Sequence, residues 1–200
     1  MNMNYPKFKI EINNLTKKYH KRYVYKNFNY VIENLTINYL KSPNGYGKST
    51  LIKCILNLIS YNGTIKSNVK TFAYLPERII VPELIKVEKF LGLMLLDNEK
   101  VNYLLSQFKI DKTKYIYELS KGMRQKILLI QALATNSDCY IFDEPLNGLD
   151  DVSIELFIKE IEKLFKNGKL IIISTHQLEK FNTNNMKVIR LGELFWVFGI

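Results

Sequence analysis

The segment Ser-Pro-Asn-Gly-Tyr-Gly-Lys-Ser-Thr, at residues 42–50, constrains the fold of this chain more than any other stretch. A β-like segment at 35–40 precedes it, and an apolar segment of helical composition follows it at 51–59. A strand, a glycine-rich loop, a lysine, a hydroxyl residue and a helix, in that order, are the context of a phosphate-binding loop. A plain glycine turn between a strand and a helix is the alternative, and the Gly-Lys-Ser sequence disfavours it. The candidate phosphate-site residues are Ser42, Pro43, Asn44, Gly45, Tyr46, Gly47, Lys48, Ser49 and Thr50.

The residue types in this segment have separate roles in holding phosphate. Gly45 and Gly47 allow backbone conformations in which successive N–H groups point at phosphate oxygens, and the helix that begins near Lys48 adds its positive dipole end. Lys48 can reach the outer phosphates, and the Ser49 hydroxyl suits a Mg²⁺ ligand. Ser42 stands where the strict pattern has glycine, which would cost about 1 kcal/mol if that backbone had φ above zero.

Length and composition are those of one globular domain. The chain has 200 residues, of which 47% are hydrophobic and 24% charged. The first residues contain no secretory signal, and no apolar run approaches the length of a membrane span. Cys54 and Cys139 lie in apolar segments, so we expect reduced core thiols rather than a metal site. The net charge of +10 would suit nucleic acid, an anionic membrane face or an acidic partner. Because the lysines are scattered and no nucleic-acid-binding motif accompanies them, we expect no nucleic-acid partner.

Hydrophobic patterning predicts an α/β fold with a mainly parallel sheet. We expect one domain over 1–200, with a core at about 1–76 and 127–200 and an inserted helical lobe at about 77–126. Short strands at the amino-terminal end are expected to form an antiparallel β subdomain. These strands are 8–12, 23–25, 28–32 and 35–40. Further strands are predicted at 63–65, 71–75, 139–143 and 170–174, helical structure at 83–118, helices at 120–134 and 152–166, and a hairpin at 186–200 that turns near Gly192.

Polar residues follow the predicted buried strands, where parallel sheets place their ligand-binding groups. Asp143 and Glu144 end the apolar run at 139–142, and their side chains point to opposite sides. Asp143 suits Mg²⁺ coordination, whereas Glu144 could orient or deprotonate an attacking water. Glu77 follows the strand at 71–75. His176 follows the strand at 170–174, although a lone histidine is more often structural. Two carboxylates at a turn are the simpler alternative for the acidic pair, and the upstream phosphate loop disfavours it.

Two further features could contact a nucleotide. Ser120 is a suitable N-cap for the helix at 120–134, so the start of this helix is a second anion-binding terminus, as every capped helix start is. Tyr19 lies where an aromatic ring could stack on a base, although a tyrosine more often packs in the fold.

Taken in order, these motifs resemble the ATP-binding subunits of ABC transporters over nearly the whole chain. Residues 42–50 are similar to the Walker A loop, and 139–144 to Walker B followed by the catalytic glutamate. Residues 119–125 resemble the family signature in its Leu-Ser-Lys-Gly-Met form, and 146–150 resemble the D-loop. The resemblance places His176 as the switch histidine, Tyr19 as the base-stacking aromatic and Glu77 at the Q-loop glutamine position.

The resemblance implies a P-loop NTPase core that binds ATP and Mg²⁺ and hydrolyses ATP. It assigns catalysis to Lys48, Glu144 and His176, metal binding to Ser49, Glu77 and Asp143, and nucleotide contacts across a dimer to Ser120, Gly122 and Asp150. The implied partners are a separate transmembrane permease and a second ATPase subunit, identical or paired, with ATP at the interface. The subunit would be cytoplasmic and peripheral on the inner face of the membrane. The form of the signature resembles that of subunits that export drugs or peptides.

Two other functions compete with this one. A soluble ABC-type ATPase that acts on nucleic acid or the ribosome would suit the net charge of +10. A degenerate nucleotide-binding regulatory subunit would suit the departures from the family pattern at Ser42 and Lys121. Together with Glu77, these departures bear on the rate of turnover more than on nucleotide binding.

Overall fold

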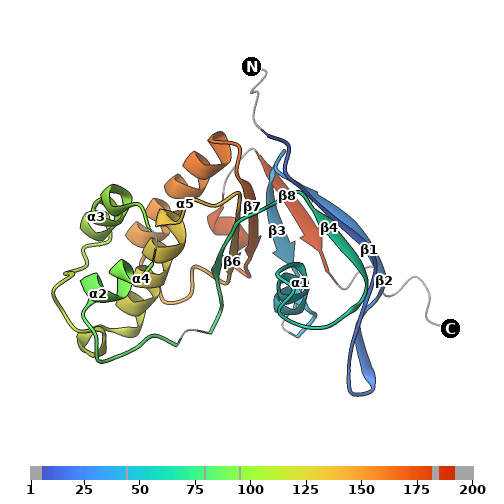
Figure 1. Cartoon of the computed structure of the whole chain (residues 1–200), viewed down its shortest axis with the longest axis horizontal. Helices are drawn as coiled ribbons and strands as arrows, with labels where there is room; N and C mark the ends of the chain where they lie inside the picture. Colours follow the sequence, from blue (N-terminus) through green and yellow to red (C-terminus); the bar gives the residue numbers. More distant parts are fainter. Residues whose placement is uncertain (1–5, 44, 79, 95, 182–184, 192–200) are drawn as a thin grey trace.

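A five-stranded parallel sheet forms the centre of the molecule. The computed structural model describes residues 6–43, 45–78, 80–94, 96–181 and 185–191 (Figure 1). The strand order in the sheet is β5-β6-β7-β3-β8, with every neighbouring pair parallel. The strands are β3 (Ile37–Lys41), β5 (Phe72–Leu75), β6 (Cys139–Asp143), β7 (Leu170–Ser174) and β8 (Met186–Arg190). Every residue of β6 and β7 is buried, which explains their unbroken apolar sequences.

An antiparallel sheet with the order β2-β1-β4 lies beside α1. Its strands are β1 (Lys9–Tyr19), β2 (Arg22–Glu33) and β4 (Asn62–Ser67). The segments 23–25 and 28–32, expected as separate strands, are parts of the single strand β2. Register shifts in the β1–β2 ladder break the alternation of side chains, so the sequence pattern underestimates the length of this strand.

The prediction that 35–40 belongs to the antiparallel sheet is wrong. This segment contains β3, which pairs in parallel with β7 and β8. Its residues Ile37, Asn38, Tyr39 and Leu40 are all buried, so the strand requires cover on both faces, and only the central sheet supplies it. This position places the phosphate loop, which follows β3, at the carboxyl end of the parallel strands.

Helices cover both faces of the central sheet (Figure 1). They are α1 (Lys48–Ile55), α2 (Val87–Gly92), α3 (Asn98–Gln107), α4 (Lys121–Ala134) and α5 (Asp151–Lys166), with the 3₁₀ turns η1 (Ile116–Glu118) and η2 (Leu178–Lys180). The region 83–118 is helical only in parts. The Asp97 side chain accepts a hydrogen bond from the Lys100 amide and so starts α3 as a separate helix.

Two hydrophobic cores lie on opposite faces of the parallel sheet, because alternate strand residues point in opposite directions. Tyr140 and Phe142 face the core formed with α2, α3, α4 and α5. Cys139 and Ile141 face the core formed with α1 and the antiparallel sheet. Cys54 and Cys139 are both buried free thiols, as predicted, and burial raises the pKa of each.

Among the strands that the structure describes, β8 lies at one edge of the central sheet. It pairs with β3 through residues 186–190, which agrees with an edge strand that packs on the core. The predicted turn near Gly192 lies outside the described residues. Within the part of the chain that the structure describes, no helix has the length and apolar character needed to cross a membrane.

Candidate active site

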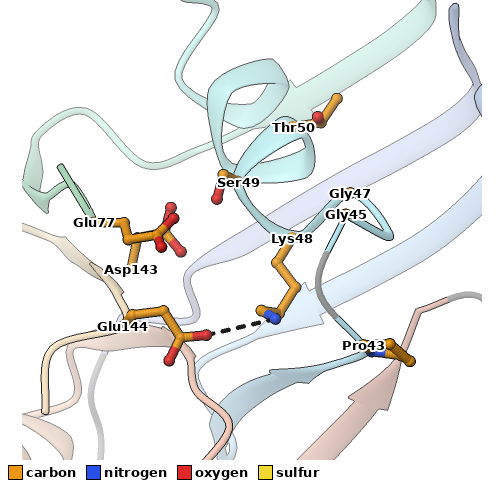
Figure 2. Close-up of a pocket in the computed structure, with 9 residues that line it drawn as sticks. All are labelled: Pro43, Gly45, Gly47, Lys48, Ser49, Thr50, Glu77, Asp143 and Glu144. Atoms are coloured by element: carbon orange, nitrogen blue, oxygen red, sulfur yellow. Dashed lines mark ion pairs between the residues drawn. The ribbon is translucent and has the colours of Figure 1, made fainter. Parts of the chain in front are cut away.

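A pocket at the carboxyl end of the parallel strands collects residues from three separate parts of the sequence. Figure 2 shows the loop after β3, Glu77 after β5, and the two carboxylates at the end of β6 around one space. Every residue that lines the pocket was predicted from the sequence as a site residue. They are Pro43, Gly45, Gly47, Lys48, Ser49, Thr50, Glu77, Asp143 and Glu144.

The backbone of the phosphate loop explains both its glycines and its serine. Gly45 and Gly47 have φ values of +78° and +99°, in the left-handed region that glycine adopts without strain. Gly47 is the N-cap of α1, which places the first N–H groups of the helix at the pocket. Ser42 is not among the described residues with positive φ, so its replacement of glycine carries no left-handed strain. Asn44 lies outside the described residues.

Lys48, Glu144 and His176, which the resemblance assigns to catalysis, form a triangle at one end of the pocket. Lys48 Nζ lies 3.4 Å from Glu144 Oε1 and 3.2 Å from His176 Nε2, and it donates to the Ser42 carbonyl at 3.1 Å. The Lys48 and Glu144 side chains are only 8% and 6% exposed. Such burial strengthens their ion pair relative to one in water.

The geometry leaves one acceptor of this triangle without an aligned donor. Glu144 Oε1 is buried and lies close to Lys48 Nζ and His176 Nε2, yet it accepts no well-directed hydrogen bond from the described residues. His176 Nε2 is 3.1 Å from this oxygen without a hydrogen bond to it, and this nitrogen can accept from Lys48 Nζ in the tautomer that leaves it unprotonated. A buried carboxylate oxygen with this unused capacity is suited to accept a hydrogen bond from a water or a ligand.

A second group of oxygen ligands faces the same pocket. Glu77, Asp143 and Ser49 all line the pocket, and Figure 2 shows the Ser49 hydroxyl above the two carboxylates. The described residues contain no cluster of three or more His, Cys, Asp or Glu side chains arranged for a metal. Two carboxylates and a hydroxyl are instead the partial set of hard ligands that Mg²⁺ takes from a protein when phosphate and water oxygens complete its shell.

Two residues that the sequence patterns did not identify, Ser174 and Tyr74, lie near these carboxylates. The Ser174 hydroxyl donates to Asp143, and the Glu144 amide donates to the Ser174 carbonyl at 3.0 Å. Burial, together with the nearby charges of Asp143 and Glu77, raises the pKa of Tyr74 to about 12, so this phenol stays neutral. Both are single polar positions within apolar strands, and no local pattern distinguishes them from packing residues.

The start of α4 forms a separate group of the predicted residues, none of which lines the pocket. The Ser120 hydroxyl caps α4 by accepting from the Met123 amide at 3.2 Å. A Cβ atom on Gly122 would lie 2.6 Å from the Gly148 carbonyl oxygen, so glycine is required for this close approach. The start of α4 therefore packs directly on the loop that follows β6.

The Asp150 carboxylate is engaged within the chain. It caps α5 by accepting from the Ser153 amide at 2.8 Å, and it pairs with Lys126 of α4 at 2.7 Å. The Lys126 bond, followed by the bonds to Ser153, holds the pKa of Asp150 well below its usual range. The carboxylate thus joins α4 to α5, and a contact with nucleotide across a dimer stays a prediction.

Tyr19 ends β1 and pairs with Arg22 across the β1–β2 turn, and it is not among the residues that line the pocket. Its side chain is 45% exposed, and Lys17 Nζ lies 4.9 Å from the ring centroid. The exposed ring is available to a ligand, and base stacking stays a prediction.

Comparison with known proteins points to one family. The family model described as "ABC transporter" matches residues 25–147. An uncharacterised ABC transporter ATP-binding protein of Methanocaldococcus jannaschii is 37% identical over 183 residues, which cover 86% of this chain and 70% of the relative. A zinc import ATP-binding protein of Buchnera aphidicola is 31% identical over 92% of this chain and 80% of the relative. The solved structure of an ATP-binding subunit of an ABC transporter superposes with a TM-score of 0.80 at 26% identity, covering 91% of this chain and 87% of that one.

Proposed function

This chain belongs to the family of ABC transporter ATP-binding subunits, which hydrolyse ATP for transport, and we propose that its pocket binds Mg²⁺–ATP to power a separate membrane permease. The observation that carries the proposal is the triangle of Lys48, Glu144 and His176 beside the phosphate loop. Phosphoryl transfer depends mainly on positioning and charge stabilisation, and this triangle supplies a cation, a carboxylate and an imidazole at one point.

In this mechanism the phosphates lie against the N–H groups at the start of α1, and phosphate oxygens compete with Glu144 for the Lys48 ammonium. Glu144 Oε1, which accepts no aligned hydrogen bond in the structure, then accepts one from the attacking water. His176 orients this carboxylate through its amide, which donates to Glu144 Oε2 at 3.3 Å. Ser49, Glu77 and Asp143 would hold Mg²⁺, which supplies positive charge to the phosphate oxygens.

We further propose that two ATPase subunits, identical or paired, enclose the nucleotide between them. The capped start of α4 is an anion-binding terminus that does not line its own chain's pocket. Ser120 and Lys121 are exposed there, so a second subunit could place them on the phosphates held by this one. The permease would contact the helical lobe and the loop after Glu77, where Ile80 and Leu84 are exposed, and would hold the subunit at the inner face of the membrane.

The direction of transport has two candidates. The Leu-Ser-Lys-Gly-Met form of the signature supports export of a drug, a peptide or a similar compound, by resemblance. Import of a metal ion is the second candidate, because a relative that is 31% identical over most of this chain is named for zinc import. The permease, which selects the cargo, decides between them.

Light scattering of the Glu144→Gln protein, with and without Mg²⁺–ATP, tests the shared-site mechanism. We expect a monomer that becomes a dimer only with ATP, because the amide cannot act as a base and hydrolysis no longer separates the subunits. Lys48→Ala is the control and should stay monomeric, since it lacks the cation that holds the phosphates. A Glu144→Gln protein that binds ATP but stays monomeric would contradict the proposed role of the α4 start.

A further inference from the structure

A buried tyrosine outside the pocket contacts the phosphate loop directly. Tyr25, in β2, is fully buried, and its hydroxyl donates a 2.8 Å hydrogen bond to the Gly47 carbonyl. Its ring packs on Phe28, with the ring centroids 5.2 Å apart. Burial raises the pKa of the Tyr25 phenol, so the hydroxyl stays protonated and remains a donor at any physiological pH.

The Gly47 carbonyl receives hydrogen bonds from two directions, which fix its orientation. The Leu51 amide donates to it at 2.8 Å, as the first backbone bond of α1, and the Tyr25 hydroxyl donates to it from β2. Because a trans peptide is planar, the carbonyl of Gly47 and the N–H of Lys48 point in opposite directions. A carbonyl held along α1 therefore directs the Lys48 N–H out of the amino-terminal end of the helix, on the side of the phosphate site.

The contact between β2 and the loop is too close to admit a side chain on Gly47. A Cβ atom there would lie 2.6 Å from Val24 Cγ1 and 2.9 Å from the Tyr25 hydroxyl oxygen. Gly47 also has a φ of +99°, so its conformation and its surroundings both require glycine. The antiparallel sheet thus supports the loop by packing as well as by a hydrogen bond.

We propose that Tyr25 is a positioning residue of the phosphate site: its hydroxyl orients the Gly47–Lys48 peptide so that the Lys48 N–H can donate to the phosphate nearest the start of α1. The inference rests on the proposed function, because it requires a nucleoside di- or triphosphate in the pocket. It adds a residue of the antiparallel sheet, remote in sequence from the phosphate loop, to the machinery of the site.

Calorimetric titration of Tyr25→Phe with Mg²⁺–ADP tests the inference, because this change removes the hydroxyl and keeps the ring. We expect the Kd to rise about threefold to tenfold, the effect of one misaligned hydrogen bond. Tyr30→Phe is the matched control, since Tyr30 lies on the same strand and stacks on Phe28, whereas among the described residues only Tyr25 of this pair donates to the phosphate loop. In steady-state ATPase assays, the KM of Tyr25→Phe should rise while kcat at saturating ATP stays near that of the unmodified chain.

The outcomes separate this inference from the proposed function. If the unmodified chain does not bind Mg²⁺–ADP, both the proposed function and the inference are refuted. If the unmodified chain binds and Tyr25→Phe binds equally well, only the inference is overturned, whatever the melting temperature of the variant. If Tyr25→Phe does not fold, 3-fluorotyrosine at position 25 gives a more acidic phenol and a stronger donor. Mg²⁺–ADP should then bind more tightly, and an unchanged Kd would refute the positioning role.

Discussion

Replacement of Gly122 by alanine should separate the start of α4 from the loop that follows β6. The added Cβ atom would lie 2.6 Å from the Gly148 carbonyl oxygen, well inside the normal contact distance. The obstructing atom belongs to the backbone, and Gly148 is held at a φ of +77°, so the clash cannot be relieved by rotation of a side chain. Overpacking of this kind costs roughly 1–3 kcal/mol. Alanine also favours the helix by about 1 kcal/mol relative to glycine, which offsets part of the loss.

Alanine at a second glycine, Gly92, is the control that separates the effect of the clash from the effect of helix propensity. At Gly92, at the end of α2, an added Cβ atom would have no neighbouring atom within 4 Å, and this glycine is not among the described residues with positive φ. Gly92→Ala therefore carries the change in helix propensity and no clash. In thermal unfolding, we expect Gly122→Ala to melt below Gly92→Ala by about 2–4 °C for each kcal/mol of clash. Equal melting temperatures would refute the claim that the Gly148 carbonyl is held against Gly122.

Gly122→Ala also tests whether the start of α4 is independent of the phosphate pocket within one subunit. Gly122 does not line the phosphate pocket, so Gly122→Ala should bind Mg²⁺–ADP with unchanged affinity. In a Glu144→Gln background, however, the displaced α4 start should weaken the ATP-dependent dimer. A loss of Mg²⁺–ADP affinity in Gly122→Ala would show that the two regions are not independent in the monomer.

Two further predictions concern Asp150 and Ser42. Asp150→Ala should lower the free energy of unfolding by about 1 kcal/mol at pH 7, because α5 loses its N-cap, and chemical denaturation measures this. The pKa of Asp150 is lower in the folded than in the unfolded chain, because the Lys126 bond stabilises the charged form. The loss of unfolding free energy in Asp150→Ala should therefore be complete above about pH 4 and should shrink as the pH falls further. A loss that does not change with pH would argue against this role of the Asp150 charge. Ser42→Gly should lower the free energy of unfolding by about 0.5–1 kcal/mol, since Ser42 has no positive φ and glycine only adds freedom to the unfolded chain. Stabilisation by this glycine would contradict the absence of strain.

Local sequence patterns predicted the features that depend on interactions between residues close together in the sequence. The order of strand, glycine loop, lysine and helix located the pocket, because the positive φ values of Gly45 and Gly47 and the helix start are encoded within a few residues. The apolar runs of β6 and β7 likewise predicted buried parallel strands. The N-cap at Ser120 was predicted from residue type and position alone.

Features that depend on tertiary contacts were not predicted. Alternation in 35–40 indicated a strand but not its sheet, because the choice between β7 and β1 as a neighbour depends on cover from distant segments. The bulges that extend β2 depend on its pairing with β1. Ser174 and Tyr25 each have one polar side-chain atom on a strand, and only the folded structure shows which atom it reaches. The position of Tyr74 near the charges of Asp143 and Glu77 likewise follows from the folded structure alone.

The contacts of α4 explain why the two anion-binding regions are linked inside one chain although they do not share a pocket. Gly122 packs on Gly148, and Lys126 pairs with Asp150, so the first turns of α4 are fixed to the loop between β6 and α5. That loop begins directly after Glu144, whose amide is bonded to β7. A displacement of the α4 start must therefore either break these contacts or move the backbone that carries Glu144. The carboxylate that faces the phosphate loop and the helix start that would face a second subunit are therefore connected through these contacts, one of which Gly122→Ala is expected to break.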